Sequence, residues 1–293
     1  MSVPSHPVVV AHRGASADAP ENTLAAIDLA ASQGADVVEV DARLSADGAL
    51  AVVHDDTLER TTDCAEALPA KAPWRVADLT AADLAEVRAG VHDGVPQRVP
   101  TLEEVIDRTR ALGLGLLVEL KPSAADGALE SAVAAALHDV GDDDWLAERV
   151  LLASFDAASL DRAGEAIGAP RPQRALILAG LVAADGVVTA AEPATPGLAA
   201  PGMALAEVRE AIAGRGLGHL GLALLGRSGR PEHDLDAATV AWFRAGGVEL
   251  NVFANSEAQL AAALDLDLAS VLTDHPGRAV ALRAQRRAAQ GAG

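Results

Sequence analysis

Glu39 and Asp41 are two carboxylates that stand two residues apart inside a short apolar run, where they alternate with Val38 and Val40. Successive side chains of a β-strand point to opposite faces, so the carboxylates share one face and the valines share the other. If the valines pack against helices, the carboxylates face an interior in which unpaired charges are costly. The pair then needs a bound cation or an internal salt bridge. A solvated strand face explains the pair equally well when it is taken alone.

A third carboxylate shows the same spacing further along the chain. Glu119 and Lys121 are separated by Leu120 at the end of another apolar run, so their side chains also point together. Three carboxylates at neighbouring strand ends offer the oxygen ligands that Mg²⁺ and Ca²⁺ take, with water and substrate oxygens completing the shell. The sequence holds a single Cys and no Cys/His cluster, which argues against a structural zinc site. The three carboxylates are therefore candidate ligands of a divalent metal.

Two histidines stand at the ends of expected strands. His12 and Arg13 follow the first apolar run, and His54 ends a short strand that comes after a tight turn at residues 45–48. Folding this short strand back beside the strand of Glu39 brings His54 to the same mouth as His12. An imidazole titrates near neutrality, so two of them flanking a metal-held phosphate could act as base and acid. Each histidine alone is more commonly structural.

Short β-branched or Leu-rich runs alternate with longer Ala-rich helical stretches throughout the chain. This alternation is typical of repeated βα units around a parallel sheet, and the apolar character of the runs suits strands covered on both faces. Barrels of this kind fit a chain of 293 residues and keep their sites at strand ends. We predict an α/β fold, a single (β/α)8 TIM barrel over residues 1–293, with strands at Val8–Ala11, Val37–Asp41, Leu114–Leu120, Val150–Ser154, Arg174–Leu178, His219–Leu224, Val248–Phe253 and Ser270–Thr273.

Several helix starts can be predicted from side chains that cap a first turn. Asn22 precedes a helical stretch that Gly ends, and we interpret it as the cap. Thr101 with Glu104, and Ser256 with Gln259, have the spacing of capping boxes. These signals agree with the barrel but do not identify its chemistry.

Two regions fit the repeat less well. Residues 56–99 separate the second and third strands, and we interpret them as a small inserted subdomain at the functional face, where long βα insertions usually lie. Residues 180–202 are rich in Ala, Pro and Gly and show little periodicity, so the role of this stretch stays open. Residues after Arg278 are expected to form a last helix.

The composition excludes some classes of partner. A formal net charge of −19 disfavours nucleic acid, because such binding depends on Lys and Arg that neutralise phosphates. A small anionic substrate would need a few local cations or a bound metal. The single Cys64 cannot form an intrachain disulfide, and the first residues lack the features of a secretory signal, so we expect a cytoplasmic protein. The apolar runs are too short for a transmembrane segment.

Together these stretches resemble the glycerophosphodiester phosphodiesterase family across nearly the whole chain. No single tripeptide is diagnostic, but their order and spacing form a strong signal. The matching stretches are His12–Gly14, Pro20–Thr23, Glu39–Asp41, Asp47–Gly48, His54–Asp55, Leu58–Thr62, Pro100–Glu104, Glu119–Lys121, Ser154–Phe155 and Leu272–Pro276.

The resemblance implies metal-assisted hydrolysis of a glycerol-linked phosphodiester to glycerol phosphate and an alcohol. It implies that Glu39, Asp41 and Glu119 hold Mg²⁺ or Ca²⁺ and that two histidines form the acid/base pair. One histidine would activate the glycerol 2-hydroxyl for attack on phosphorus, and water would then open the cyclic phosphate. In this chain the two histidines are His12 and His54. The resemblance also implies phosphate contacts at Arg13 and Lys121 and supporting residues at Glu21, Asn22, Phe253 and Asp274.

Two departures from the family pattern bear on substrate choice. The family often has Trp-Thr-Val-Asn at the seventh strand, where this chain has Val252 to Asn255 with Phe253 as the aromatic residue. A Gly usually follows the Thr-Thr pair and is missing near Cys64, which puts the turn of the insertion in doubt. The other histidines are treated as structural or surface residues, namely His6, His92, His138, His219, His233 and His275; of these, His275 follows Asp274 at the end of the eighth strand and is a candidate addition to the site.

Two rival functions stay open at this point. One is a phospholipase D-like activity of the same barrel on lysophospholipids or sphingomyelin, which a wide apolar mouth would favour. The other is a barrel that binds phosphate without catalysis. Which alcohol leaves, which metal is native and whether the barrel is oligomeric are not encoded in recognisable patterns.

Overall fold

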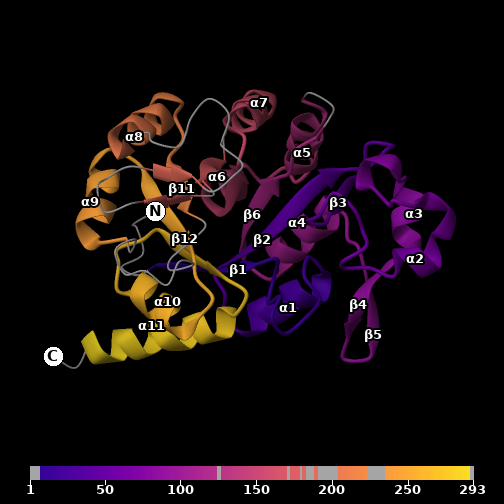
Figure 1. The fold of residues 1–293 in the computed structure, drawn as a ribbon, viewed down its shortest axis with the longest axis horizontal. Helices are drawn as coiled ribbons and strands as arrows, with labels where there is room; N and C mark the ends of the chain where they lie inside the picture. The colour runs from indigo at the N-terminus through magenta and orange to yellow at the C-terminus, as the bar shows by residue number, and fades with distance from the viewer. Residues whose placement is uncertain are drawn as a thin grey trace.

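The computed structural model describes residues 7–123, 127–169, 172–178, 180–182, 188–190, 204–222 and 235–290. Within these residues eight parallel strands close into a barrel, because β1 pairs with both β2 and β13; β3 extends the sheet to nine strands (Figure 1). The barrel strands are β1 (Val8–His12), β2 (Val37–Leu44), β6 (Gly115–Leu120), β7 (Val150–Ser154), β8 (Gln173–Leu178), β11 (His219–Leu222), β12 (Glu249–Phe253) and β13 (Ser270–Thr273). The predicted (β/α)8 barrel is confirmed.

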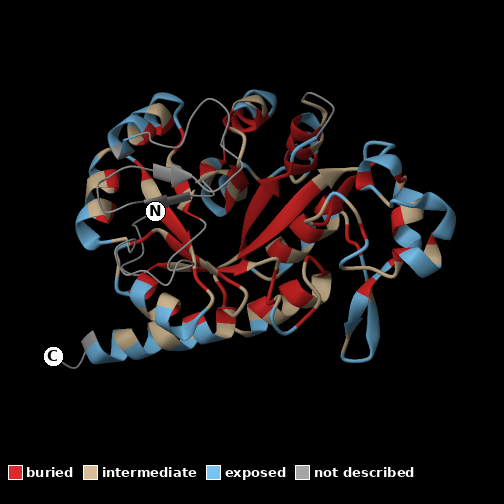
Figure 2. Cartoon of the chain, viewed as in Figure 1, coloured by how far each residue is buried: buried red, intermediate tan, exposed pale blue. Residues whose placement is uncertain are grey.

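Helices connect the barrel strands and pack around them. Val38 and Val40 of β2 are fully buried in one apolar cluster with Ile27 and Ile106 from two of these helices. Figure 2 shows the buried strands inside the layer of helices, whose outer faces are exposed. The helices are α1 (Leu24–Ser32), α4 (Leu102–Ala111), α5 (Ala128–His138), α6 (Asp143–Arg149), α7 (Ala157–Ile167), α8 (Leu205–Gly214), α9 (Ala237–Ala245), α10 (Glu257–Leu264) and α11 (Pro276–Gln290). No helix in the described residues has the length and apolar character needed to cross a lipid bilayer.

The capping signals are confirmed at two helices and wrong at a third. The boxes of Thr101 with α4 and Ser256 with α10 are both formed. Helix α1, however, is capped by Thr23, whose side chain accepts a hydrogen bond from the Ala26 N–H. Asn22 lies before the cap with φ of 58°, and its side-chain amide donates a hydrogen bond to the Asp41 carboxylate of the barrel instead. Local sequence cannot distinguish these two uses of an Asn, because the competing partner is distant in sequence.

The inserted segment between β2 and α4 has an apolar core of its own. The short strand β3 (Leu50–Val52) folds back antiparallel to β2, as predicted. Leu58, Cys64 and Leu79 are buried in a cluster separate from that of the barrel. Figure 1 shows the segment beside β2 and β3, at the right of the view. Its elements are α2 (Cys64–Ala67), η1 (Pro69–Lys71), η2 (Val76–Asp78), α3 (Ala81–Glu86), β4 (Arg88–His92) and β5 (Val95–Arg98).

Some predicted boundaries differ from the observed ones. β2 continues past Asp41 to Leu44, because its last residues pair with β3. The unassigned stretch 180–202 contains β9 (Gly180–Val182) and β10 (Val188–Ala190), which pair antiparallel; its other residues lie outside the described ranges. The predicted sixth strand is observed as β11, and residues 223 and 224 also lie outside them.

Gly14, directly after the first histidine and its neighbouring arginine, is expected to tolerate no side chain. Its φ is 81°, and a Cβ there would lie 2.6 Å from Ala26 Cβ and 2.7 Å from the Ala26 carbonyl carbon. Gly14→Ala should lower the free energy of unfolding by about 2–4 kcal/mol, measured by urea denaturation. The matched control is Gly48→Ala, because Gly48 has φ of 85° but open space around it. That change should cost only about 1 kcal/mol; equal losses would contradict the steric argument.

Candidate active site

Three buried carboxylates converge at the carboxyl ends of β2 and β6. Alternation along β2 turns Glu39 and Asp41 to the barrel side, and the parallel register sets Asp41 beside Glu119. Glu39 is 2%, Asp41 0% and Glu119 8% exposed. One oxygen of each lies within 4.8 Å of one oxygen of the others. The sequence placed these side chains on one face; the register brings them into one cluster.

Two cations partly compensate the carboxylate cluster. Lys121 Nζ lies 2.9 Å from Asp41 Oδ1 and 2.5 Å from Glu119 Oε1. Arg13 Nε lies 3.3 Å from Asp41 Oδ2. Glu39 Oε2 accepts a hydrogen bond from the Arg13 N–H at 2.8 Å, but the buried Glu39 Oε1 has no hydrogen-bond partner among the described residues. Three acidic groups thus face two fixed cations, and Glu39 Oε1 is available to another ligand.

The charges in the cluster shift its titration. Burial raises the pKa of Glu39 to about 8, and the neighbouring Asp41 adds to the increase. Burial also raises the pKa of Glu119, although Lys121 opposes it. Burial acts on Asp41 in the same direction, but Lys121 and Arg13 outweigh it and hold the pKa of Asp41 below its ordinary value. Glu39 is therefore the carboxylate whose charge is least compensated, and a bound cation would relieve it.

Hard oxygen donors, burial and an unpartnered Glu39 oxygen fit a divalent cation such as Mg²⁺ or Ca²⁺. Asn22 supports this arrangement from behind. Its Nδ2 donates to Asp41 Oδ2 at 2.7 Å, and its Oδ1 accepts from the Asp41 N–H at 3.3 Å. The first contact orients the Asp41 carboxylate, and the second binds the Asp41 backbone.

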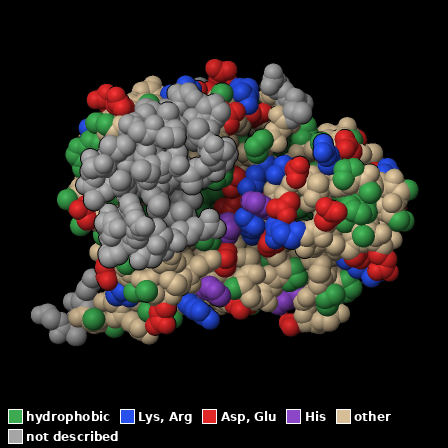
Figure 3. Space-filling model, viewed as in Figure 1, with side chains coloured by type: hydrophobic (Ala, Val, Ile, Leu, Met, Phe, Trp, Pro, Cys, Tyr) green, Lys and Arg blue, Asp and Glu red, His purple; other side chains and the backbone are tan. Residues whose placement is uncertain are grey.

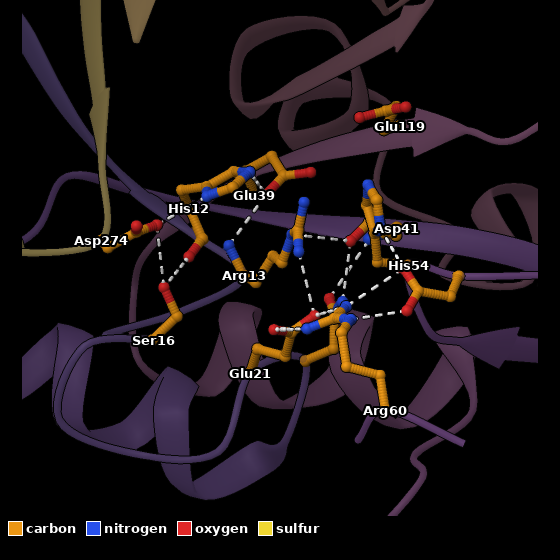
Figure 4. A network of polar contacts seen from close by, with 12 residues as sticks. His12, Arg13, Ser16, Glu21, Glu39, Asp41, His54, Arg60, Glu119 and Asp274 are labelled. Carbon is orange, nitrogen blue, oxygen red and sulfur yellow. Dashed lines mark hydrogen bonds and ion pairs between the residues drawn. The ribbon is translucent and has the colours of Figure 1, made fainter. Parts of the chain in front are cut away.

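His12, at the end of β1, is held by a carboxylate on one ring nitrogen. Its Nδ1 lies 2.7 Å from Asp274 Oδ1, and its Nε2 lies 4.0 Å from Glu39 Oε2 (Figure 4). Ser16 Oγ lies 2.7 Å from the His12 carbonyl oxygen and 3.1 Å from Asp274 Oδ1, and the Asn255 amide donates to the other Asp274 oxygen. Burial acts to lower the pKa of His12, but the Asp274 hydrogen bond and the charge of Glu39 outweigh it and raise that pKa.

Phe253 forms an aromatic wall beside His12. The two ring centroids are 4.8 Å apart and the rings are nearly perpendicular, at 71°. This edge-to-face contact restricts rotation of the imidazole, in addition to its Asp274 partner. Asp274 and Phe253, the two residues expected to support the site, thus both contact the His12 ring.

His54, just past β3, has a carboxylate partner of its own. Its Nδ1 lies 2.6 Å from Asp55 Oδ1, and Arg43 donates to the His54 carbonyl oxygen at 2.6 and 2.9 Å. Burial and the charge of Lys121 lower the pKa of His54. Each histidine therefore contacts its own carboxylate through Nδ1, but the pKa of His12 is raised and that of His54 is lowered.

Arg60 of the inserted segment ties this second histidine to the barrel. Its Nε lies 2.6 Å from Asp55 Oδ2, and its Nη1 lies 2.7 Å from Glu21 Oε2. Glu21 in turn lies 3.0 Å from Arg13 Nη1. Figure 4 shows this chain of ion pairs below the carboxylate cluster. The predicted residue Glu21 thus supports both Arg13 and the insertion.

A cavity of about 400 Å³ is lined by seven of the eleven candidate residues. Figure 3 shows acidic, basic and His side chains gathered at a hollow in the middle of one face. The other four candidates do not line the cavity, namely Glu21, Asn22, Asp41 and Asp274. Among the described residues, the polar side chains that line the cavity are His12, Arg13, Glu39, His54, Glu119, Lys121 and Asn251, and the aromatic ones are Phe155 and Phe253.

Sequence reasoning assigned no role to Ser16, Asp55, Arg60 and Asn255. Asp55 follows His54 directly, and this adjacency was a usable signal for a carboxylate partner. Arg60 is 39 residues from Glu21, so their contact could not be read from spacing.

Most other histidines lie away from the cavity. The rings of His138 and His219 contact the Ile167 carbonyl and Asn251, respectively. His6 and His233 lie outside the described residues.

Asp274→Asn is expected to lower the pKa of His12. The aspartate raises that pKa through its hydrogen bond and its charge, and the amide removes the charge while keeping the size. NMR titration of the His12 ring protons in metal-free protein measures the downward shift of this pKa. The control Ser16→Ala removes a neutral hydroxyl that contacts Asp274 and the His12 carbonyl oxygen, so it should change the pKa much less. An unchanged titration in Asp274→Asn would contradict the electrostatic role.

Comparison with known proteins assigns this geometry to a family. The model of the glycerophosphoryl diester phosphodiesterase family matches residues 12–278. A glycerophosphodiester phosphodiesterase of Caldanaerobacter subterraneus is 34% identical over 157 residues, which are 52% of this chain and 60% of that protein. The match spans 49% of the length of one curated relative and 60% of this one, so the chain covers less than two thirds of either.

Solved structures share the fold over nearly the whole chain. A phosphodiesterase of Oleispira antarctica in complex with the product sn-glycerol-3-phosphate has a TM-score of 0.68 and 28% identity, covering 94% of this chain and 96% of that one. A glycerophosphodiester phosphodiesterase of Agrobacterium tumefaciens has a TM-score of 0.67 and 25% identity, covering 94% and 99%.

Proposed function

The chain belongs to the glycerophosphoryl diester phosphodiesterase family, and from this membership we propose that it hydrolyses glycerophosphodiesters to glycerol 3-phosphate and an alcohol. The observation that carries the proposal is that two carboxylate-held imidazoles line one cavity with Glu39 and Glu119, two members of the cluster of three buried carboxylates. Neither group alone is specific. Their combination meets the needs of phosphodiester cleavage, which requires charge stabilisation at phosphorus and proton transfer at two oxygens.

Glu39, Asp41 and Glu119 are the residues that would hold the divalent metal. When bound, Mg²⁺ or Ca²⁺ supplies Lewis-acid polarisation of the phosphoryl oxygens, worth several kcal/mol in such sites. Arg13 and Lys121 line the same cavity and provide local positive charge for the phosphate. A protein of net charge −19 needs such local cations to bind a small anion.

The first step assigns different proton transfers to the two histidines. His54, whose lowered pKa favours the neutral ring, takes the proton of the glycerol 2-hydroxyl as that oxygen bonds to phosphorus. His12, whose raised pKa favours the protonated ring, gives a proton to the alcohol oxygen as its bond to phosphorus breaks. The products of this step are a cyclic glycerol phosphate and the free alcohol.

The second step reverses the two roles. His12, now neutral, takes a proton from water as the water oxygen bonds to phosphorus. His54, now protonated, returns its proton to the glycerol 2-oxygen as that ring bond breaks, which gives glycerol 3-phosphate. Asp274 and Asp55 hold the rings at Nδ1 throughout, so that Nε2 of each is the atom available for transfer.

Phosphorus NMR of the reaction with glycerophosphocholine and glycerophosphoethanolamine tests this proposal. We expect the resonance of glycerol 3-phosphate as the product from both, with a cyclic glycerol phosphate visible in rapid-quench samples. Release of phosphocholine or phosphoethanolamine would contradict the proposed cleavage side. Inversion at phosphorus with direct incorporation of solvent oxygen would contradict the cyclic route alone.

A further inference from the structure

One side of the barrel interior is lined by unusually small residues. Ala153 of β7 and Ala175 of β8 are partners in the parallel register, and Gly221 of β11 is the register partner of Ile177. The three small residues lie on strands that are consecutive in the sheet, and all line the 400 Å³ cavity. Barrel interiors are usually filled by layers of bulky branched side chains. The small size of Ala153, Ala175 and Gly221 therefore leaves space that a standard barrel would fill.

The neighbouring large side chains do not close this space. Leu151, Ile177 and Leu272 line the same cavity, yet each is only partly buried. Gly221 is not required by crowding, because a Cβ there would meet Ile177 Cγ1 at an ordinary 3.5 Å. Its φ also lies outside the left-handed region that favours glycine. The missing side chain thus has no packing or backbone reason, and its effect is to open the cavity.

The space is continuous with the candidate active site and is apolar. β11 lies across the barrel from β2, so Gly221 and Glu39 stand on opposite walls of one cavity. Among the described lining residues, the only negative charges are Glu39 and Glu119, and both belong to the carboxylate cluster. A cationic alcohol group would find no further counter-charge on this described wall. An alkyl or aryl group would instead remove apolar wall from water.

We infer that this half of the cavity is a subsite for an apolar arm of the substrate, attached beside the phosphodiester. The inference rests on the proposed function and adds the substrate class to it. A cavity of about 400 Å³ falls in the range of pockets that enclose a whole small ligand, so it holds more than a phosphate group. The arm could belong to the leaving alcohol or to a chain esterified to the glycerol, since both lie next to the phosphate.

Two substrate series on the metal-loaded wild-type protein test the subsite and distinguish the two sources. One series consists of methyl, butyl and hexyl esters of glycerol 3-phosphate. The other compares glycerophosphocholine with its hexanoyl ester at the glycerol 1-position, below micellar concentrations. Each buried methylene should raise kcat/KM about threefold, so the hexyl ester should exceed the methyl ester by at least about 30-fold if the arm is the alcohol. A rise in the hexanoyl pair instead assigns the arm to the glycerol.

Gly221→Val fills the subsite. In the series that shows a rise, it should lower the ratio of kcat/KM for the longest substrate to kcat/KM for the shortest by at least about tenfold. The matched control is Gly218→Val, because Gly218 also lies outside the left-handed region, has open space around it and does not line the cavity. That control should keep the wild-type ratio. Thermal unfolding verifies that each variant is folded, and Ala175→Val replaces Gly221→Val if the latter is not.

The outcomes separate the two levels of the account. Turnover of the short esters with no rise in either series overturns the subsite and leaves the proposed hydrolysis standing. An unchanged ratio in the folded filling variant also overturns it. Turnover of no ester with any metal overturns the proposed function, and the subsite with it.

Discussion

Replacing Glu39 with Gln is expected to lower kcat/KM by at least about 10³-fold and to remove the response of the protein to Mg²⁺ or Ca²⁺. The change keeps the size of a buried side chain and removes one of three clustered oxygen anions. Loss of several kcal/mol of charge stabilisation corresponds to such a factor. Activity assays across metal concentrations, together with the metal-induced rise in the thermal midpoint, measure both effects. A variant that keeps its thermal shift would contradict the assignment of Glu39 as a ligand.

The same variant should be more stable than the wild type without metal, which separates ligand loss from misfolding. The pKa of Glu39 is about 8 in the folded protein, against 4.5 ordinarily. Between these values the folded state retains a proton that the unfolded state has released, so wild-type stability falls as pH rises through this window. The amide introduced by Glu39→Gln does not titrate, so the advantage of the variant should grow from about pH 4.5 and level off above about pH 8. Urea denaturation in EDTA at pH 5, 7 and 9 measures this trend; a variant less stable at every pH would contradict it.

Replacing His54 with Ala is expected to lower kcat by about 10²- to 10⁴-fold while the metal response stays intact. A positioned proton transfer is worth this range, and the ring does not belong to the carboxylate cluster. Steady-state kinetics at saturating metal measures the loss, and the metal-induced thermal shift should match that of the wild type.

Two comparisons give the His54 prediction its specificity. Added imidazole should restore part of the activity of His54→Ala, because it can enter the vacated end of the cavity and accept the proton. His92→Ala is the control, since His92 lies in the hairpin strand β4 of the same insertion and does not line the cavity. That variant should keep wild-type kcat. Equal losses in the two variants, or no rescue by imidazole, would contradict a proton-transfer role for His54.

The fold and the central groups of the site followed from short-range patterns. Alternation alone put Glu39 and Asp41 on one side of a strand, and the valines between them are indeed buried against helices. The turn before β3 predicted that His54 returns to the mouth of His12, and both line the cavity. Such features depend on periods of two residues and on the repeat of βα units, which a sequence displays directly.

The connections between these groups depend on partners that are distant in the chain. The contact of His12 with Asp274 spans 262 residues, and a strand pattern gives only the end of the strand where each residue lies. Asn22 was misassigned as a cap because its actual partner, Asp41, is reached only after β1 and β2 pair.

The apolar subsite was equally hidden in the sequence. Ala153, Ala175 and Gly221 are ordinary small residues until the barrel register sets them on consecutive strands around one space. Register is a property of the closed sheet, so the sequence alone could not locate this apolar subsite.

Restoring activity to metal-free protein tests the central claim most directly. The purified protein is treated with EDTA, and release of glycerol 3-phosphate from glycerophosphocholine is followed as Mg²⁺ or Ca²⁺ is added back, with Glu39→Gln measured in parallel. We predict no release in EDTA, saturable recovery with one or both metals in the wild type, and no recovery in the variant. Full release in EDTA, or equal recovery in Glu39→Gln, would contradict hydrolysis at a metal held by the carboxylate cluster.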